Sequence, residues 1–544
     1  MLKHIFVILA VLVILNSWLL PAELLTTAES SGFQKTSTYN DVMEFIFEAQ
    51  KRSGKIHILS LTTSTEGRMI PLLVISKEGI RSLAELRTVN KPAVLIMANI
   101  HAGEVEGKEA SLMLIREIVT GQFEEILEHQ VLLIIPIFNA DGNEKFGHNR
   151  GDNGPELAGM RYNGQYLDLN RDYLKLESPE VSALVKLFNE WDPILFVDLH
   201  TTNGSYHREP VTYTTQVNPD SDPVLCQYMW EKFFPAVSKT LKDKFDVDSI
   251  PYGNFVDRTQ PEKGWQNHAF NARYGNNYGG LRNRFTVLVE NYAHADFKTR
   301  VMGCFGFVKS ILLYTNRHGA EMQEMCRTSD LKTRTSYFKE KFTLEFETKK
   351  LMELTIKSYQ FEIEKIKPED RHKYPPWFGD AIAKKTDILK DYKVDYYSKA
   401  VPVKSIPLAG AYIILPFHDT IITNLKNHGI IVEKIRKAVN LTVEQFILEE
   451  IKPADRLYQG HVVLSIKGHY EEKEVTVPGD SYFVSMQQPL ARLIPVLLEP
   501  QSEDGLLSWG FFNREIISQW TGKPASYPVY RLNEPTIPVE RCQE

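Results

Sequence analysis

Cysteine is scarce in this 544-residue chain, which contains four at widely separated positions: Cys226, Cys304, Cys326 and Cys542. No two of them form the C-x-x-C pairs of structural zinc sites, and their density is far below that of a disulfide-built domain. Any metal must therefore be held by histidine and carboxylate side chains. One or two disulfides stay open in an oxidising compartment, but mostly buried thiols are the simpler expectation.

Positive charge is not in excess, because 63 lysines and arginines are set against 69 aspartates and glutamates, for a formal net charge of -6. This balance gives no basic surface to attract DNA or RNA, so no nucleic-acid partner is expected. The hydrophobic fraction of 43% and the charged fraction of 24% are those of an ordinary globular protein. At this length two folded domains are expected.

Long apolar runs are absent except at the N-terminus. The run at 5–20 follows the positive charge of Lys3 and precedes the small residues 26–28, which suit a cleavage site. It falls short of the roughly 20 residues that span a bilayer comfortably. We therefore expect a signal peptide over residues 1–28 and an exported protein, secreted or periplasmic, with no membrane partner after cleavage. An uncleaved anchor is the alternative.

Short apolar runs alternate with helix-length amphipathic segments up to about residue 316, which is typical of an α/β layer fold. Central strands, covered on both faces, are predicted at 93–98, 131–137, 194–197 and 285–289. Helices are predicted between them at 105–119, 179–190 and 223–242.

The character of the chain then changes. A charged stretch at 332–350 and a proline- and lysine-rich passage at 365–385 indicate the boundary between two domains. Beyond it, alternating runs at 462–466 and 474–477 predict strands and hairpins. We therefore expect a β-rich C-terminal domain over residues 345–540.

The feature that points to chemistry is the pair His101 and Glu104, spaced as H-x-x-E directly after the predicted strand at 93–98. The same spacing starts at His318 and at His469, where charged surroundings favour surface pairs. In an open α/β sheet, ligands bind at the carboxyl ends of the strands. His101 and Glu104 are therefore the candidates.

A third ligand lies at the end of another strand, because the run at 194–197 carries His200 to the same sheet edge. A lone histidine after a strand is usually a core or loop residue, but two histidines and a glutamate form a known ligand set of catalytic zinc. We predict one zinc ion per chain, held by His101, Glu104 and His200.

A general base is also needed, since zinc activates water but a side chain must take the proton. The run at 285–289 leads directly into Glu290, and burial at the end of this strand would raise the pKa of its carboxyl group. Taken alone, Glu290 could cap a helix or pair with Arg282 or Arg284. Beside the predicted metal ligands, the catalytic interpretation is favoured.

Asn170 and Arg171 form the third candidate group. A guanidinium matches a carboxylate bidentately, and an amide beside it can donate a further hydrogen bond. Capture of a peptide's C-terminal carboxylate requires such a pair, so both are candidate substrate-binding residues.

The order of these residues resembles the zinc metallocarboxypeptidase family typified by carboxypeptidase A: His-x-x-Glu, Asn-Arg, His, and a glutamate that ends a late apolar strand. The similarity extends over residues 35–316 and includes Asn139-Ala140-Asp141-Gly142, where the family has Asn-Pro-Asp-Gly. The chain looks like an exported, bacterial-style member with an extra C-terminal β-rich domain.

The resemblance implies an α/β fold, a mixed-sheet α/β sandwich of the zinc carboxypeptidase type, over residues 35–325. It implies zinc on the three ligands named above, substrate carboxylate on Asn170 and Arg171, and Glu290 as base. The family also uses an earlier arginine to polarise the scissile carbonyl. Arg161 and Arg150 both qualify, and Arg161 is preferred because its nine-residue lead over Asn170 is similar to the spacing in the cytosolic branch of the family.

A substrate-binding tyrosine is expected at Tyr274 or Tyr278, in a loop that departs from the digestive enzymes. The predicted reaction is zinc-dependent removal of C-terminal residues from a peptide substrate. A zinc amidohydrolase or deacylase, acting on small acylated amino acids or cell-wall peptides, would share the metal site and differ in the pocket. A non-catalytic binding protein is a third interpretation. The presence of Glu290 argues against it, because a site without catalytic activity does not need a buried carboxylate. The preferred residue and the oligomeric state stay open.

Overall fold

The computed structural model describes residues 23–149, 153–374, 379–517, 520, 522–524, 526–537 and 541–543. Most of the predicted signal peptide, and Arg150, lie outside the described residues. Within the described ranges, we find no helix with the length and apolar character needed to cross a membrane.

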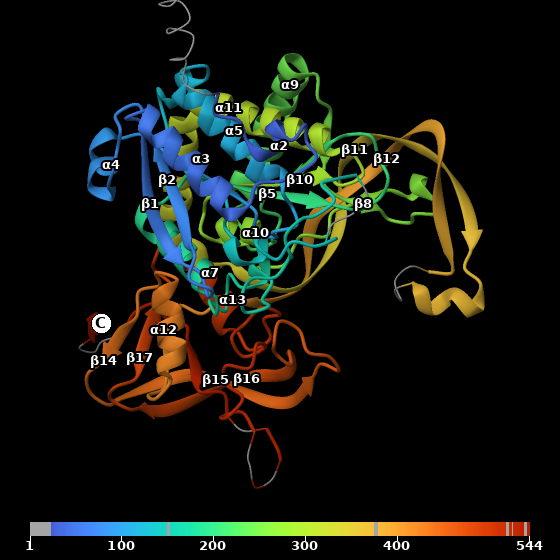
Figure 1. The fold of residues 1–544 in the computed structure, drawn as a ribbon. Helices are drawn as coiled ribbons and strands as arrows, with labels where there is room; N and C mark the ends of the chain where they lie inside the picture. Colours follow the sequence, from blue (N-terminus) through green and yellow to red (C-terminus); the bar gives the residue numbers. More distant parts are fainter. Residues whose placement is uncertain are drawn as a thin grey trace, which may run out of the picture.

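An eight-stranded mixed sheet forms the centre of the first domain, in the order β1-β2-β4-β3-β5-β10-β6-β7 (Figure 1). Its strands are β1 (Ile56–Thr63), β2 (Met69–Ile75), β3 (Ala93–Ala98), β4 (Val131–Ile135), β5 (Leu195–Thr202), β6 (Val211–Thr214), β7 (Ser249–Pro251) and β10 (Phe285–Tyr292). The four central strands β4, β3, β5 and β10 run parallel and are almost wholly buried. Strands buried on both faces read as continuous apolar runs, which is why they were predictable.

Helices cover both faces of this sheet. The side chains of β3 alternate between two hydrophobic cores, with Val94 and Ile96 in one and Leu95 and Met97 in the other. The first core is closed by α3 (Tyr39–Arg52), α5 (Glu106–Val119), α9 (Phe234–Phe245) and α11 (Phe297–Ser336). The second is closed by α7 (Pro179–Trp191) and α10 (Gly275–Leu281).

The predicted helices are present with small changes. The helix expected at 223–242 is divided into α8 (Pro223–Tyr228), a π-helical turn (Met229–Phe233) and α9. The strands β5 and β10 continue past the predicted ends at 197 and 289, so His200 and Glu290 lie within strands rather than after them. Short helices α2 (Thr27–Ser30), α4 (Leu83–Val89) and α6 (Ala140–Asn143) complete the domain.

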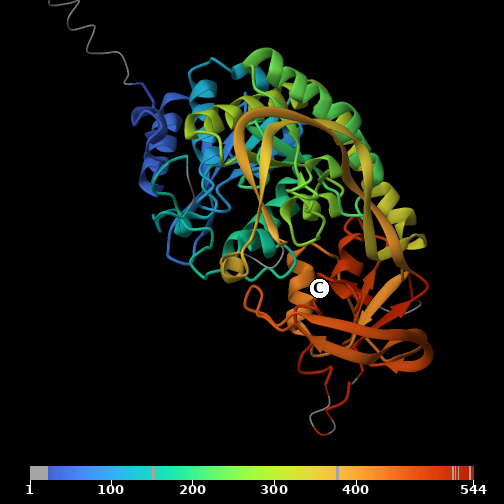
Figure 2. The ribbon, with the colours of Figure 1, turned by 90° about the vertical axis from the view of Figure 1, so that its right-hand side faces the viewer.

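Residues 341–365 and 381–407 form a long antiparallel ribbon, where the sequence indicated the domain boundary. Its strands, β11 (Lys341–Lys365) and β12 (Ala381–Pro407), curve across the first domain in Figure 2. The strand β12 also pairs with β9 (Trp265–Gln266), which pairs with β8 (Asn254–Phe255). The ribbon is therefore attached to the first domain through β9 and does not form a free linker.

The C-terminal region is β-rich, as predicted. A seven-stranded sheet has the order β16-β15-β18-β13-β17-β14-β19. Its elements are β13 (Ala411–Ile414), α12 (Asp419–Asn427), β14 (Glu433–Ile435), β15 (Val439–Pro453), β16 (Leu464–Val477), β17 (Tyr482–Ser485), α13 (Leu493–Leu498), β18 (Val529–Leu532) and β19 (Arg541–Gln543). The second hydrophobic core of the first domain continues into this region without interruption.

The free thiols are largely buried, as expected. Cys304 and Cys326 are buried and Cys226 is half-buried, and all three are unpaired by disulfides.

A buried carboxylate links the first domain to the ribbon. The Asp220 side chain accepts a hydrogen bond from the backbone N–H of Thr343 at 3.1 Å, and Arg492 donates to the Asp220 carbonyl oxygen at 2.7 Å. Burial raises the pKa of Asp220 to about 7. Its contribution to stability is therefore fully present below the ordinary value of 3.8 and is lost as the pH rises through 7.

We expect Asp220→Asn to remove this pH dependence, because the amide keeps an acceptor for Thr343 but carries no charge. The melting temperatures of the variant and the wild type should be similar near pH 4, where Asp220 is protonated. At pH 7.5 the variant should melt at a higher temperature, because ionisation of Asp220 lowers the free energy of unfolding of the wild type by about 1.4 kcal/mol for each unit of pKa shift. Thermal unfolding followed by circular dichroism across this range provides the measurement. If the difference in melting temperature between the variant and the wild type is the same at every pH, the titration of Asp220 does not affect stability.

Candidate active site

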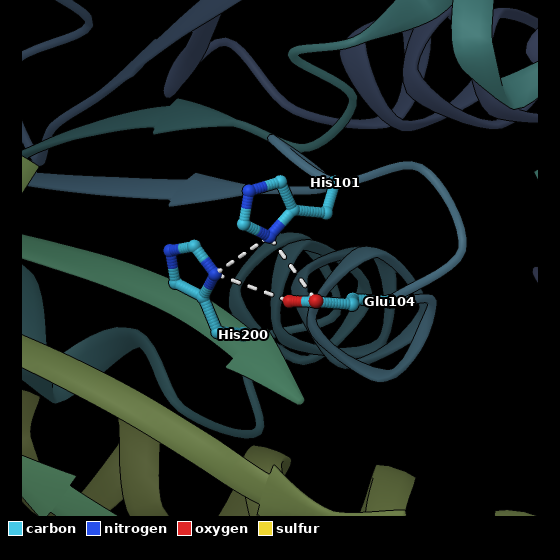
Figure 3. A group of neighbouring side chains, drawn as sticks. All are labelled: His101, Glu104 and His200. Carbon is cyan, nitrogen blue, oxygen red and sulfur yellow. Dashed lines mark hydrogen bonds and ion pairs between the residues drawn. The ribbon is translucent and has the colours of Figure 1, made fainter. Parts of the chain in front are cut away.

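Three donor atoms converge at the carboxyl edge of the central strands (Figure 3). The Nδ1 atom of His101 lies 3.1 Å from Glu104 Oε1 and 3.2 Å from His200 Nδ1, and His200 Nδ1 lies 3.1 Å from Glu104 Oε2. All three side chains are buried. The predicted ligands are thus brought together around one point.

The loop after β3 explains how His101 and Glu104 come to face each other. Asn99 turns the chain with a left-handed φ of 66°, a conformation that asparagine tolerates better than most residues. Its side-chain amide donates to the carbonyl oxygens of Ala102 and Glu104 at 3.2 and 3.3 Å. The backbone N–H of Glu104 donates to the His101 carbonyl at 2.9 Å, which closes a tight turn.

The donor set fits zinc. Tetrahedral zinc with ligand distances of about 2.0 to 2.1 Å places its ligands roughly 3.3 Å from one another, close to the separations seen here. Two imidazoles and one carboxylate are also among the known ligand sets of catalytic zinc.

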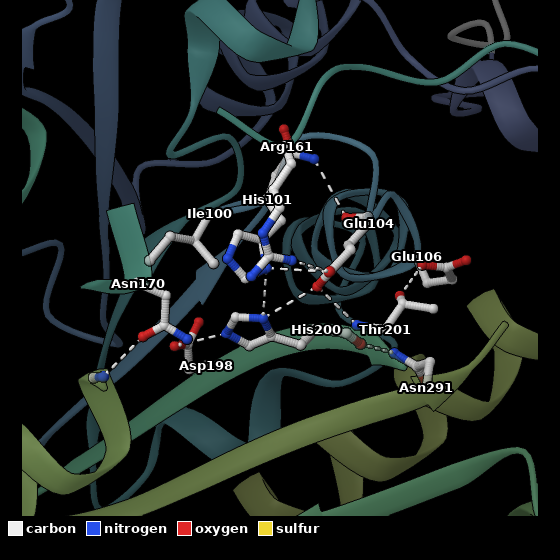
Figure 4. A network of polar contacts seen from close by, with 12 residues as sticks. Ile100, His101, Glu104, Glu106, Arg161, Asn170, Asp198, His200, Thr201 and Asn291 are labelled. Atoms are coloured by element: carbon white, nitrogen blue, oxygen red, sulfur yellow. Dashed lines mark hydrogen bonds and ion pairs between the residues drawn. The ribbon is translucent and has the colours of Figure 1, made fainter. Parts of the chain in front are cut away.

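Each imidazole is held from behind by an aspartate that the sequence analysis missed. His101 Nε2 lies 3.0 Å from Asp168 Oδ1. His200 Nε2 lies 2.9 Å from Asp198 Oδ2 (Figure 4). Carboxylates behind metal-bound histidines fix the ring orientation and raise ligand basicity. A signal for Asp198 was present, because residues two apart in a strand share a face and Asp198 precedes His200 by two.

The negative charges of these carboxylates favour a positive charge between the donor atoms of His101, Glu104 and His200. The pKa of His200 lies well above its usual value; burial alone would lower it, but Asp198 and Glu104 outweigh burial. Asp198 is fully buried, and its ion-pair partner is the His200 ring. A bound cation would be stabilised by the same field.

Glu290 lies beside the ligands because β10 pairs in parallel with β5, which places Glu290 opposite His200. Its side chain is half-buried and lines the same cavity. Of the arginines considered as its partners, Arg282 donates to Asn189 at 2.7 Å and Arg284 to Asp192 at 2.8 Å.

A cavity of about 250 Å³ lies beside the predicted metal ligands. It is lined by His101, Glu104, Arg161, Asn170, Arg171, His200, Thr201, Thr202, Asn203, Tyr252, His268, Ala269, Tyr274, Asn276, Leu288 and Glu290. Of the two candidate tyrosines, Tyr274 lines this cavity. Tyr278 instead is fully buried, and its hydroxyl lies 2.9 Å from His428 Nδ1 in the C-terminal region.

Asn170 and Arg171 occupy the end of the cavity next to Tyr274. The Asn170 side-chain oxygen accepts from the backbone N–H of Gly275 at 2.9 Å, so the NH2 group is what this amide can offer a ligand. The Arg171 guanidinium stacks over the Tyr274 ring, 4.4 Å from its centroid. A planar cation fixed on an aromatic face is well suited to bind a carboxylate.

Arg161 lies beside Asp168 and Glu104. Its Nε atom donates to Asp168 Oδ2 at 2.9 Å, and its Nη1 atom is 3.4 Å from Glu104 Oε1. The side chain is 38% exposed, so the guanidinium faces the cavity as well as its partners.

Comparison with known proteins identifies the class of this domain. Residues 42–278 match the family model described as zinc carboxypeptidase. The chain is 23% identical over 488 residues to carboxypeptidase 2 of Trichophyton equinum and 24% identical over 487 residues to carboxypeptidase 2 of Trichophyton rubrum. Each alignment covers 86% of this chain and 81% of the relative.

Solved structures include similar chains. A metallo-carboxypeptidase from Burkholderia cenocepacia aligns with a TM-score of 0.40 and 15% identity, over 52% of this chain and 70% of that one. Carboxypeptidase A from Helicoverpa armigera aligns with a TM-score of 0.40 and 17% identity, over 53% and 75%.

The family match and the metal cluster together define a zinc-dependent hydrolase of peptide bonds. The first domain is therefore similar to the zinc carboxypeptidase family, whose model it matches over residues 42–278. The predicted family, fold class and zinc cofactor are thereby confirmed.

We expect Asp198→Asn to weaken zinc binding by about 10- to 100-fold, because asparagine keeps the shape but is a poorer acceptor for the His200 ring. Competition with a chelator, followed by metal analysis, measures the affinity. Asp246→Asn, an exposed carboxylate at the end of α9, serves as control. Equal affinity in Asp198→Asn and the wild type would show that this carboxylate does not support the ligand.

Proposed function

We propose that this protein is an exported carboxypeptidase that removes residues from the free C-terminus of peptides. The observation that supports it best is that a carboxylate-binding group, formed by Asn170, Arg171 and Tyr274, lines the same cavity as the metal cluster and Glu290. An amidohydrolase acting on other small substrates would share the metal cluster but would not require that group.

In the proposed reaction, Arg171 and Asn170 bind the substrate's terminal carboxylate and so direct the last peptide bond toward His101, Glu104 and His200. When bound by these three residues, zinc polarises a carbonyl group and lowers the pKa of water. Glu290 accepts the proton from the attacking water and passes it to the leaving amine. Arg161 stabilises the negative charge that develops on the carbonyl oxygen.

Export is proposed from the apolar run at 5–20. The described end of the predicted signal peptide packs onto the first domain: Ala28 is fully buried, Thr26 caps α2, and Arg116 donates to the Leu24 carbonyl at 3.2 Å. We therefore place the cleavage point before Leu24 rather than after Ala28, so that the mature domain keeps this packed segment.

We expect Glu290→Gln to reduce hydrolysis by at least about 100- to 10,000-fold while zinc content stays normal. Glutamine preserves the shape of the side chain but cannot take a proton from water at neutral pH. Peptide turnover and metal analysis on the same preparation give the two readouts, with the exposed Glu353→Gln on β11 as control.

Two outcomes would contradict the role of Glu290. Near-normal turnover in Glu290→Gln would mean that another group is the base. Loss of zinc would instead make Glu290 a metal ligand or a residue that supports the ligands.

We expect Arg171→Ala to lower kcat/KM for peptides with a free C-terminus by about 10- to 100-fold and to leave amidated peptides almost unchanged. A charge-assisted bidentate pair is worth about 1.5 to 3 kcal/mol, and the amide cannot form it. Matched peptides that differ in the terminal group alone provide the measurement. Equal losses for both peptides would make Arg171 structural and would remove the main support for exopeptidase action.

A further inference from the structure

A hairpin of the C-terminal domain reaches the active site. The strands β15 and β16 are joined by a loop that ends in Tyr458-Gln459-Gly460-His461. The N–H of Tyr458 donates to the His461 carbonyl at 2.8 Å, and the reverse bond is 3.0 Å long. Gln459 and Gly460 have φ of 52° and 78°. Two consecutive residues in the left-handed region at the tip of a hairpin match a type I′ turn. This tight turn fixes the positions of the flanking residues Tyr458 and His461.

The tip makes polar contacts with the segment that holds the proposed substrate-binding residues Asn170 and Arg171. The Tyr458 hydroxyl accepts a hydrogen bond from Arg171 Nε at 2.9 Å. The Gln459 side-chain oxygen accepts from the backbone N–H of Asp168 at 2.8 Å. His461 Nε2 lies 2.7 Å from Glu177 Oε1. The hairpin tip is therefore fixed against the segment from Asp168 to Glu177.

The ring of Tyr458 is anchored independently of its hydroxyl. It stacks on Trp509, with the ring centroids 5.9 Å apart and an interplanar angle of 20°. Trp509 is buried, and Lys175 and Arg273 of the first domain lie over its ring at 4.6 and 5.3 Å. Removal of the Tyr458 hydroxyl should consequently leave the hairpin in position.

The contact with Tyr458 sets the orientation of the Arg171 guanidinium. Its Nε atom is bonded to Tyr458, its Nη1 atom donates to the Asn170 carbonyl at 2.9 Å, and its plane rests on Tyr274. A guanidinium has five N–H donors in a rigid fork. Because Nε and one N–H of Nη1 already donate to these oxygens, the Nη2 group and the second N–H of Nη1 are the donors that this arginine can offer a ligand.

We propose that Tyr458 is a positioning residue of the active site: the C-terminal domain holds Arg171 ready to bind the substrate's terminal carboxylate. This inference rests on the proposed carboxypeptidase function. It gives the C-terminal domain a role in substrate binding, because a residue 287 positions away in the sequence completes the carboxylate-binding group.

The test is Tyr458→Phe, which removes the hydroxyl and keeps the ring on Trp509. KM for a peptide with a free C-terminus should rise about 5- to 20-fold, the effect of one lost hydrogen bond to a charged group, and kcat should change less than about twofold. The amidated peptide, the zinc content and the melting temperature should be unaffected. Tyr530→Phe is the control, since that ring packs in a small core of the same domain.

A double variant tests whether Tyr458 acts through Arg171. Residues that act through one contact are not additive, so Tyr458→Phe should have no further effect on KM in the Arg171→Ala background. A further increase of the same size as in the wild type would overturn the inference.

The remaining outcomes separate the two levels of the proposal. If the wild type does not prefer a free C-terminus over an amide, the carboxypeptidase function itself fails. If the wild type has that preference and Tyr458→Phe leaves KM unchanged, the positioning role is overturned. It is also overturned if both peptides lose turnover equally as the melting temperature falls, because that result describes a structural residue.

Discussion

The parallel pairing of β3, β5 and β10 is the constraint on which the whole site depends. Leu199 of β5 is in register with Ala98 of β3, and His200 is in register with Glu290 of β10. Because side chains alternate along a strand, a slip of one residue would turn His200 and Glu290 to the opposite face of the sheet. The buried apolar residues that precede them resist such a slip, so the hydrophobic core also sets the catalytic geometry.

Charge is the second constraint, because the sheet edge gathers acidic groups in a buried place. Glu104, Asp168 and Asp198 surround two imidazoles with little exposure to water. Burial would raise the pKa of Asp168, but His101, Arg171 and Arg161 hold it well below its usual value. Buried carboxylates are stable only with partners of opposite charge. Binding of a divalent cation therefore supports the fold at this edge as well as the chemistry, and metal binding and local stability are coupled.

The sequence was informative where local pattern and function coincide. Apolar runs ending in polar residues located the strands, and the sheet-edge rule then grouped His101, His200 and Glu290. The ribbon of β11 and β12 was not recognised, because exposed strands rich in lysine and glutamate resemble a linker when their pairing partner is unknown. Tyr458 could not be found either, since its contact with Arg171 arises from the packing of two domains. Neither strand periodicity nor motif spacing contains that information.

The shared hydrophobic core decides how the C-terminal domain acts on the site. The cluster that includes Phe188 of α7 and Tyr278 of α10 continues through Leu425 of α12 to Leu497 of α13. Domains joined by a continuous apolar core do not move freely against each other, in contrast to domains that meet through small polar interfaces. The hairpin tip at Tyr458 is therefore a fixed support for Arg171 rather than a closing lid. The first domain supplies the zinc ligands and the base, whereas the orientation of Arg171 depends on both domains being packed together.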